Sequence, residues 1–244
     1  GDFAINGGSV TVDYSGQAIN TVLGDVNIAD GTVTVKRAQE SGISSTQGDV
    51  NISGGTVTVE QAQKLGINVF TGSSDAYKGT IRVTGGKVTV DAVENALQAF
   101  SGGIVFGGNA VVDAHSEKSV TAGSGDITVT GNDCDITLRT NAQSAIGGWI
   151  KLENADKIVA LGGNSEKEAA EIKREEKDGK MQLHPTGCKY LHIAKGLIPA
   201  PTPTQTPVKT PTPTDTPAVT PAPTKMPVTP VETPNPTVKP TQTP

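Results

Sequence analysis

Short runs of alternating apolar and polar residues recur along the chain at a nearly constant distance. The first twelve residues read GDFAINGGSVTV, and residues 24–35 repeat the pattern as GDVNIADGTVTV. Alternation with a period of two predicts β-strands that turn one face inward. Recurrence at a period of about 23 residues predicts stacked structural units rather than a closed globule. The opening pentads of these units begin at Gly1, Gly24, Gly48, Gly79, Gly102, Gly125 and Gly148.

Each unit contains two further elements. A Gly or Asn, which tolerates a left-handed backbone, follows the pentad and precedes a second strand. A corner then pairs a small residue with an aliphatic one, as in Gly42-Ile43 and Ala96-Leu97. Three short strands per unit, stacked about 4.8 Å apart, predict an all-β fold, a right-handed parallel β-helix of about seven rungs. A leucine-rich repeat would show LxxLxL and a helical half, and the sequence has neither.

One residue breaks the inward columns predicted for the second strands. Asp113 falls at an inward position, where an unpaired carboxylate is costly. We therefore expect a local bulge that turns Ala114 inward and Asp113 outward. Asp113 and His115 could also form an acid/base pair, but no partner motif accompanies them. The two predicted columns are Val10, Val33, Val57, Val88, Val111, Cys134 and Val12, Val35, Val59, Val90, Asp113, Ile136.

The pattern divides the chain into three parts. Residues 1–161 form the β-helix, residues 162–198 a C-terminal cap, and residues 199–244 a disordered Pro/Thr-rich linker, which holds fifteen of the sixteen prolines. Within the cap, a capping box predicts a short helix over Ser165–Glu176. Met181–Ala194 is expected to return as one or two strands. Because the chain opens inside a repeat, we expect it to be part of a longer protein.

The composition of the chain argues against some classes of binding partner. The net charge is -5 and no basic run occurs, which argues against nucleic acid. No segment reaches the roughly 18 to 20 apolar residues that span a bilayer. Cys134 and Cys188 leave the compartment and their own pairing open. A Pro/Thr-rich tail is typical of exported, surface-tethered proteins, so we expect an extracellular or cell-surface monomer tethered to a cell wall or a further domain.

Aspartates recur at one position of the first strand. Stacking would place Asp25 and Asp49 about one rung apart, where like charges repel unless they are solvated or bridged by a cation. The only long insertion, residues 71–78, adds Asp75 near the same edge. Oxygen ligands of this kind suit Ca²⁺, so Asp25, Asp49 and Asp75 are the candidate metal ligands. The alternative is that these carboxylates only cap turns.

Outward positions of the second strand form a threonine ladder. Thr34, Thr58 and Thr89 would present a flat hydroxyl surface able to hydrogen-bond a polymer, although Thr also simply suits exposed strand positions. A regular Thr array also occurs in β-helical ice-binding proteins, but Lys87 and acidic residues interrupt the flatness here. Arg82 is a further candidate carbohydrate-binding residue.

Aromatic side chains that could stack on sugar rings are few. Tyr77 lies in the insertion and is the aromatic candidate for carbohydrate binding. Tyr14 is a second one. Trp149 is expected to pack against the C-terminal cap rather than to dock a ligand.

Catalytic signatures are missing from the sequence. The polygalacturonase pattern of NxD, DD, HG and RxK is absent. Pectate lyases combine aspartates and calcium with a basic residue, but Arg82 and Arg139 fall on different strands. No carboxylate pair can be grouped around a cleft from the sequence alone.

The units GDVNISGGTVTV and SDAYKGTIRVTGGKVTV, with corners such as SGIS and ENALQA, resemble the carbohydrate-binding right-handed β-helix family of fibre-degrading anaerobic bacteria. The resemblance covers residues 1–161. It implies a polysaccharide-lyase-like β-helix, and the family includes a cellulose- and pectate-binding member with calcium sites. Members often carry an acidic run before KGxIxIxGG. Here that run is SSD, Ser73–Asp75, and it is less acidic.

These observations predict a non-catalytic extracellular module that binds a plant cell-wall or acidic polysaccharide with the assistance of calcium. Two alternatives remain open at this point. One is a structural surface adhesin, and the other is a calcium-dependent polysaccharide lyase.

Overall fold

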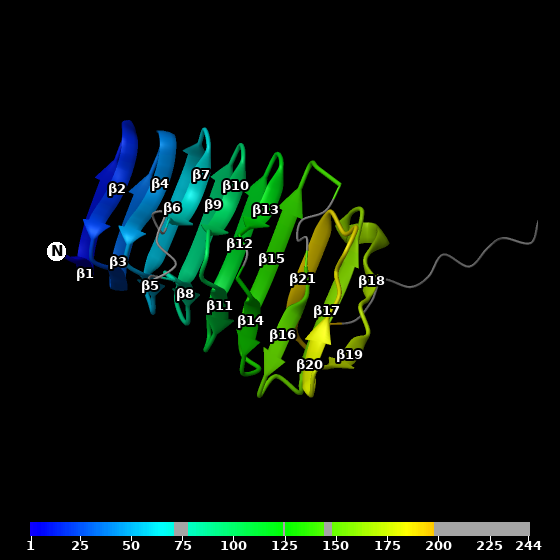
Figure 1. The fold of residues 1–244 in the computed structure, drawn as a ribbon. Coiled ribbons are helices and arrows are strands. Elements are labelled where there is room, and N and C mark those ends of the chain that lie inside the picture. The colour runs from blue at the N-terminus through cyan, green and yellow to red at the C-terminus, as the bar shows by residue number, and fades with distance from the viewer. Residues whose placement is uncertain (71–77, 124, 144–147, 198–244) are drawn as a thin grey trace, which may run out of the picture. The chain divides into compact units, whose positions relative to one another are not determined.

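The computed structural model describes residues 1–70, 78–123, 125–143 and 148–197. The chain divides into two units, Gly1–Thr202 and Pro203–Pro244, and the second lies outside the described residues, as do Asp75 and Tyr77. The described part is all-β apart from one turn of 3₁₀ helix at Glu166–Glu168, and none of its helices could cross a bilayer. It is a β-solenoid of about six turns (Figure 1).

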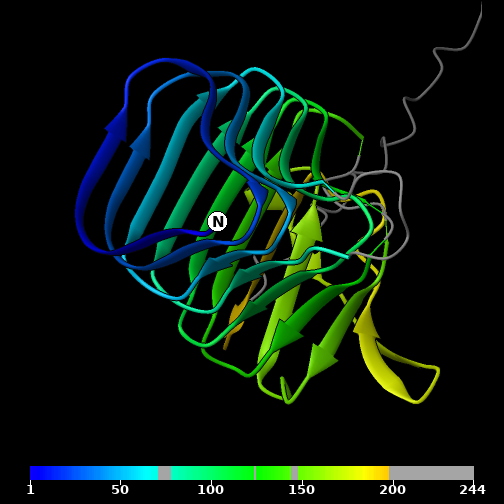
Figure 2. The same ribbon diagram turned by 60° about the vertical axis from the view of Figure 1, so that its left-hand side comes forward.

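Three parallel ladders run along the solenoid, one for each strand of a coil (Figure 2). We name them the first, second and third sheets. The first sheet comprises the N-terminal halves of β1 (Phe3–Val12) and β3 (Val26–Val35), then β5 (Val50–Ile52), β8 (Ile81–Val83), β11 (Ile104–Gly107), β14 (Ile127–Thr130) and β16 (Ile150–Glu153).

The second sheet continues each coil after a tight turn. It comprises the C-terminal halves of β1 and β3, then β6 (Thr56–Ala62), β9 (Lys87–Ala92), β12 (Val111–Ser116) and β15 (Asp135–Thr140). The third sheet comprises β2 (Ser15–Leu23), β4 (Ala38–Gln47), β7 (Leu65–Val69), β10 (Asn95–Ala99) and β13 (Ser119–Ala122).

A column of aliphatic side chains fills the interior. Val33, Val57 and Val88 stack in register and are fully buried, and Ile43, Ile67 and Leu97 do the same in the third sheet. One coil could not shield these residues from water, whereas stacked coils bury them against each other, which is the physical reason for the repetition.

The predicted inward columns are wrong after Val88 and Val90. Val112 and Ala114, rather than Val111 and Asp113, face the interior, and the β9–β12 pairing is unbroken. The extra residue lies in the preceding turn, where Gly108 has φ 55°. Asp113 therefore points outward, as expected, but without a bulge in the strand. The columns continue through Ile136 and Leu138, two residues later than the predicted Cys134 and Ile136.

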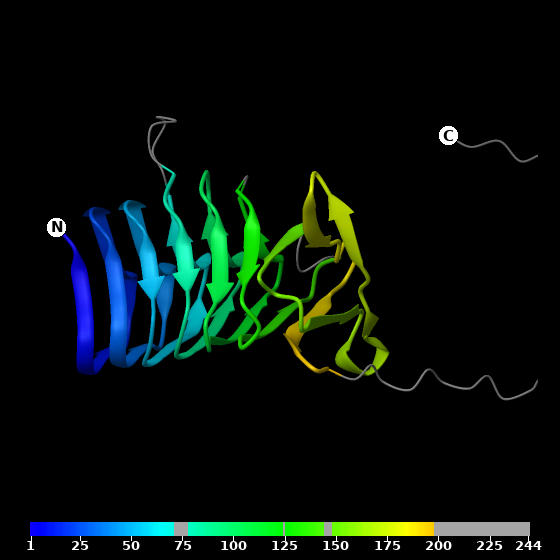
Figure 3. The ribbon, with the colours of Figure 1, turned by 90° about the horizontal axis from the view of Figure 1, so that it is seen from below.

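Antiparallel strands end the coil stack (Figure 3). β20 (Lys180–Leu183) runs antiparallel to β16 and forms a hairpin with β19 (Arg174–Lys177). β21 (Tyr190–Lys195) lies between β15 and β17 (Ile158–Gly163) and is antiparallel to both. β20 and β21 match the prediction that Met181–Ala194 returns as strands, each extending one residue beyond that segment.

The helix predicted over Ser165–Glu176 is wrong. Only Glu166–Glu168 forms a 3₁₀ turn, and Ser165 makes no side-chain cap. The rest forms β18 (Ala170–Glu171), which pairs with β17, and β19. The backbone of this segment pairs with β17 and β20, and these strand hydrogen bonds outweigh the helical propensity of its charged residues.

Candidate functional site

The threonine ladder forms as predicted. Thr34, Thr58 and Thr89 occupy equivalent positions on successive strands of the second sheet, and each is half-buried, whereas the residues two positions before and after it on the same face are exposed. Their hydroxyl groups make no hydrogen bond within the described part of the chain, so each can still donate to and accept from a ligand. We call these three residues, together with Thr11 on β1, the hydroxyl stripe.

The stripe changes character at the fifth coil. Asp113 takes the position that follows Thr89, and its carboxylate forms an ion pair with the guanidinium of Arg139. His192, on β21, lies opposite Thr137 and contacts the Asp135 carboxylate at 2.8 Å. The middle of this face therefore presents hydroxyl groups over the early coils, and an Arg–Asp ion pair and a His–Asp contact over the later ones.

A column of charged residues runs parallel to the stripe, at the C-terminal ends of the second-sheet strands. Lys36 Nζ lies 2.7 Å from an Asp13 carboxylate oxygen. This hydrogen bond and the attraction of Asp13 raise the pKa of Lys36, and the negative charge of Glu60 adds to the effect. On the next coils, His115 Nδ1 lies 3.1 Å from Asp91. Glu60 itself makes no hydrogen bond or ion pair among the described residues, so its carboxylate is available to a ligand.

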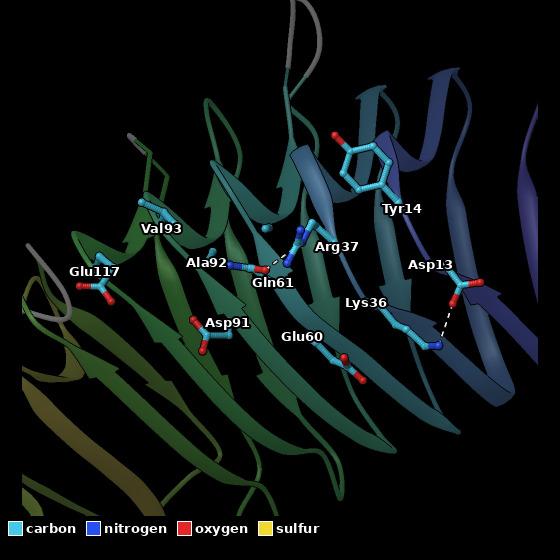
Figure 4. A pocket seen from close by; sticks show the side chains of 11 residues that line it. Asp13, Tyr14, Lys36, Arg37, Glu60, Gln61, Asp91, Ala92, Val93 and Glu117 are labelled. Carbon is cyan, nitrogen blue, oxygen red and sulfur yellow. Dashed lines mark hydrogen bonds and ion pairs between the residues drawn. The ribbon is translucent and has the colours of Figure 1, made fainter.

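A groove of about 630 Å³ follows this column at the corner between the second and third sheets (Figure 4). Small buried side chains, Ala62 and Ala92, form part of its lining and leave the corner hollow. Since the groove spans five coils, it extends over four coil spacings, or about 19 Å. We call it the corner groove. The other residues that line it are Asp13, Tyr14, Lys36, Arg37, Glu60, Gln61, Asp91, Val93 and Glu117.

Polar groups of the corner groove hold each other in place across coils. Arg37 Nε donates to Gln61 Oε1 at 3.1 Å, and both side chains project into the groove from neighbouring coils (Figure 4). Tyr14 stands at one end with 59% of its surface exposed, and its hydroxyl accepts a hydrogen bond from Gln39. The groove thus combines an exposed aromatic ring, cations and carboxylates at the spacing of the coils, a set of groups that can bind the hydroxyls and ring faces of sugars.

The aspartate ladder lies at a different corner, where the third sheet leads into the first. Asp25 Oδ1 accepts a hydrogen bond from the backbone N–H of Asp49 at 2.8 Å, and Asp49 Oδ1 accepts one from that of Thr80 at 2.8 Å. Asp2 Oδ1 accepts a hydrogen bond from the backbone N–H of Asp25 in the same way. The described geometry therefore shows the capping role that the sequence analysis gave as the alternative to metal binding.

The predicted calcium site is incomplete in the described residues. Asp25 and Asp49 each have a second carboxylate oxygen that makes no hydrogen bond to the described residues, but residues 1–70, 78–123, 125–143 and 148–197 contain no group of three His, Cys, Asp or Glu placed to share a metal ion. The predicted third ligand, Asp75, lies outside these ranges, as does the candidate sugar-binding Tyr77. Calcium binding stays a prediction.

Arg82 lies on a different sheet from the hydroxyl stripe. It is exposed on the first sheet, between Asn51 and Val105 of the adjacent coils, whereas the stripe lies on the second sheet. On the two preceding coils, Asn51 Nδ2 donates a hydrogen bond to Asn27 Oδ1 at 3.0 Å. The candidate binding residues from the sequence therefore fall on two different sheets.

Trp149 packs against the C-terminal segment, as predicted. Its indole stacks on the His184 ring, with centroids 4.1 Å apart and planes 4° from parallel, and Lys177 Nζ lies 4.5 Å from the ring centroid. Both partners belong to the region around the β19–β20 hairpin. These contacts occupy the indole, so Trp149 is a poor platform for a sugar.

Sequence reasoning missed the corner groove and two exposed phenylalanines, Phe70 and Phe100. The groove needed the register of five coils to be known, because its residues are spread from Asp13 to Glu117. The phenylalanines could have been found, since each follows the last strand residue of a third-sheet strand, at equivalent positions of adjacent coils.

Comparison with known proteins assigns the chain to a family. Residues 1–170 of the 244 match the family described as carbohydrate-binding domain-containing protein. No curated protein and no solved structure matches the chain. The match covers more than half of the sequence, including the whole hydroxyl stripe and corner groove, and the chain therefore belongs to the carbohydrate-binding domain family.

Proposed function

We propose that this chain is a non-catalytic module that binds one polysaccharide chain along the solenoid, in the corner groove and over the adjacent hydroxyl stripe. The observation that carries the proposal is the continuity of the groove over five coils. A long polymer meets polar groups at every coil of the groove, and many weak contacts then add up through multivalency.

The ligand class that we propose for the groove is an acidic or mixed plant cell-wall polysaccharide. Lys36 and Arg37 can pair with uronate carboxylates, and Arg37 offers the planar donor geometry that suits them. Tyr14 offers a ring face for a sugar at the end of the groove. Glu60 and Asp91 would accept hydrogen bonds from sugar hydroxyls or share a cation with a uronate.

The Pro/Thr-rich composition of residues 199–244 supports a location outside the cell, on a tether that spaces the module from a wall or a partner domain at up to about 3.1 Å per residue. Calcium at the aspartate ladder belongs to this proposal as well, with Asp75 as the third ligand.

Substitution of two arginines, one in the groove and one outside it, tests the proposed site. We expect Arg37→Ala to weaken binding to polygalacturonate, measured by retention in a native gel, at least about tenfold, because a charge-assisted hydrogen bond contributes about 1.5–3 kcal/mol. Arg82→Ala removes the same charge from the first sheet and is expected to leave retention unchanged. Binding that is lost in Arg82→Ala and kept in Arg37→Ala would move the site to the first sheet and refute the groove.

Polysaccharide cleavage is the second candidate, because Glu60 and Asp91 lie on adjacent coils of the groove beside Arg37. A lyase would release unsaturated products from polygalacturonate, which absorb in the ultraviolet. We expect no such increase with or without added calcium. A rise that disappears in Arg37→Ala would establish catalysis instead.

A further inference from the structure

The row of positions that carries the hydroxyl stripe continues beyond Thr89. The residues that follow Thr89 in register are Asp113, Thr137 and His192. The two residues that flank His192 in the chain are 0% and 1% exposed, so the imidazole points outward by the alternation of a strand. His192 therefore stands on the same face as the stripe, on the strand β21 that closes the second sheet.

An apolar cluster ends the row beyond His192. Leu161 lies opposite His192 on β17 and packs with Ala169 and Tyr190. Leu161 and Tyr190 are each 8% exposed. In this row, His192 is thus the last polar side chain before the cluster, at the end of the surface along which we propose that a polysaccharide lies.

The His192 ring has one nitrogen engaged and one available. Nε2 lies 2.8 Å from an Asp135 carboxylate oxygen. An ionised carboxylate only accepts hydrogen bonds, so Nε2 carries a proton. Nδ1 makes no hydrogen bond to the described residues, and the side chain is 22% exposed. The neutral ring can only accept a hydrogen bond at Nδ1, whereas the imidazolium donates one there.

Two strands flank β21, and one of them supplies the charges beside His192. β17 has no charged or titratable side chain, whereas β15 has Asp135 and Arg139. Arg139 forms an ion pair with Asp113 of β12. The charge of Asp135 is therefore the one that stays unbalanced among these groups until His192 takes up a proton.

The remaining titratable groups near His192 lie on β21 or next to it. Tyr190 is edge-on to the His192 ring, with centroids 6.4 Å apart. Burial, and then the negative charge of Glu166 on the 3₁₀ turn, raise the pKa of Tyr190, so this phenol stays neutral. Lys195 pairs with Asp133 at 3.8 Å. Histidine is the side-chain type in this set whose charge ordinarily changes between about pH 5 and 8.

We propose that His192 makes the binding of an acidic polysaccharide depend on pH, because its protonated ring binds a carboxylate of the polymer at the end of the stripe. This inference rests on the proposed function. At about pH 8, the neutral ring offers only a lone pair, and Asp135 repels a uronate. Toward pH 5, the imidazolium balances Asp135 and donates a charge-assisted hydrogen bond through Nδ1. The module therefore holds its ligand more tightly in acidic surroundings.

Two substitutions at His192 fix its charge in opposite senses. His192→Gln is neutral and His192→Lys is cationic at both about pH 5.5 and about pH 8, where the carboxylates of a soluble oligogalacturonate are also ionised. Titration calorimetry with this ligand measures the affinity. We expect wild type to bind about fivefold more tightly at the lower pH. His192→Gln should bind weakly at both pH values and His192→Lys tightly at both, a pair of outcomes that misfolding cannot produce.

The other two histidines of the chain supply the controls. His115 contacts Asp91, and His184 stacks on Trp149. His115→Gln and His184→Gln each remove an imidazole elsewhere and should keep the pH response of wild type. A response that persists in His192→Gln and disappears in His115→Gln would overturn this inference and place the titrating group beside the groove.

Nuclear magnetic resonance of the histidine rings gives a second readout. If the imidazolium binds the ligand more tightly, linkage requires that the ligand makes His192 take up its proton at a higher pH. The His184 ring should show no such change. Equal affinity of wild type at both pH values, or a His192 ring that titrates identically with and without ligand, would overturn this inference and leave the proposed function intact. A wild type that binds oligogalacturonate at neither pH would overturn the proposed function as well.

Discussion

Asp49 links two coils that are separated by the longest insertion in the chain. Its Oδ1 accepts a hydrogen bond at 2.8 Å from the backbone N–H of Thr80, 31 residues further along. Asp25 caps Asp49 in the same way one coil earlier. A carboxylate that accepts a hydrogen bond from a backbone N–H through one oxygen can have a structural role, a metal role or both, and the two roles respond differently to substitution.

Asp49→Asn and Asp49→Ala separate these roles. Asn keeps an oxygen acceptor for the Thr80 N–H and removes the charge, whereas Ala removes both. We expect Asp49→Ala to lower the free energy of unfolding by about 0.5–1.5 kcal/mol and Asp49→Asn to change it far less without calcium. If calcium binds here, its addition raises the unfolding temperature of wild type but not of Asp49→Asn. Equal responses of wild type and Asp49→Asn to calcium and EDTA would refute the predicted metal site.

The hydroxyl stripe can be tested without changing side-chain shape. Thr58→Val replaces a half-buried hydroxyl that has no partner within the described residues, so the fold should be nearly unaffected. We expect polysaccharide affinity to fall about threefold to tenfold, the effect of about 0.5–1.5 kcal/mol for one hydrogen bond. Thr128→Val, which makes the same change on the first sheet, is the matched control. Equal affinity of both variants to wild type would remove the stripe from the binding surface.

Close stacking of the coils predicts an intolerant glycine. A Cβ at Gly48 would lie 1.9 Å from the Gly24 carbonyl oxygen, a backbone atom of the adjacent coil. We expect Gly48→Ala to destabilise the fold by about 3 kcal/mol, because the coils must separate locally to accept it. At Gly16, a Cβ would meet nothing within 4 Å, so Gly16→Ala should unfold at the same urea concentration as wild type. Urea unfolding followed by circular dichroism measures both, and similar midpoints would contradict the tight stacking.

The two cysteines are free thiols, and Cys134 is 1% exposed. Burial raises the pKa of the Cys134 thiol, so at pH 8 less of it is thiolate in the folded chain than in the unfolded one. In a Cys188→Ala background, we expect folded Cys134 to react with Ellman's reagent on the order of tenfold more slowly than the denatured chain. The reaction should also accelerate at higher pH in the folded form. Equal rates in the two states would show that β15 opens readily to solvent.

The repeat pattern determines most of the fold, because stacked Val and Ile positions admit one register wherever the coils have equal length. Prediction failed where one residue was added, since Gly107-Gly108-Asn109 and the simple turn at Gly86 look alike in sequence. It also failed at Ser165–Glu176, where local charge and a capping box indicate a helix. Strand pairing with β17 and β20 supplies tertiary hydrogen bonds that no local pattern reveals.

The candidate site was less predictable than the fold. Thr34, Thr58 and Thr89 belong to one periodic strand and were identified directly. The corner groove depends on side chains at or just after the C-terminal ends of the strands, such as Gln61 in β6 and Arg37 after β3, which no alternation singles out. The aspartates were identified as a group, but their hydrogen bonds to backbone N–H groups of the next coil depend on rotamers that the sequence does not specify.

The antiparallel β21, placed between β15 and β17, limits how this protein can vary in length. A gene duplication that adds one whole coil before β15 would leave β21 and its partners in place. Each such insertion would extend the groove by about 4.8 Å. Homologous chains could therefore match ligands of different lengths by coil number alone. An insertion between β15 and β17 would instead disrupt the pairing of β21 with both strands.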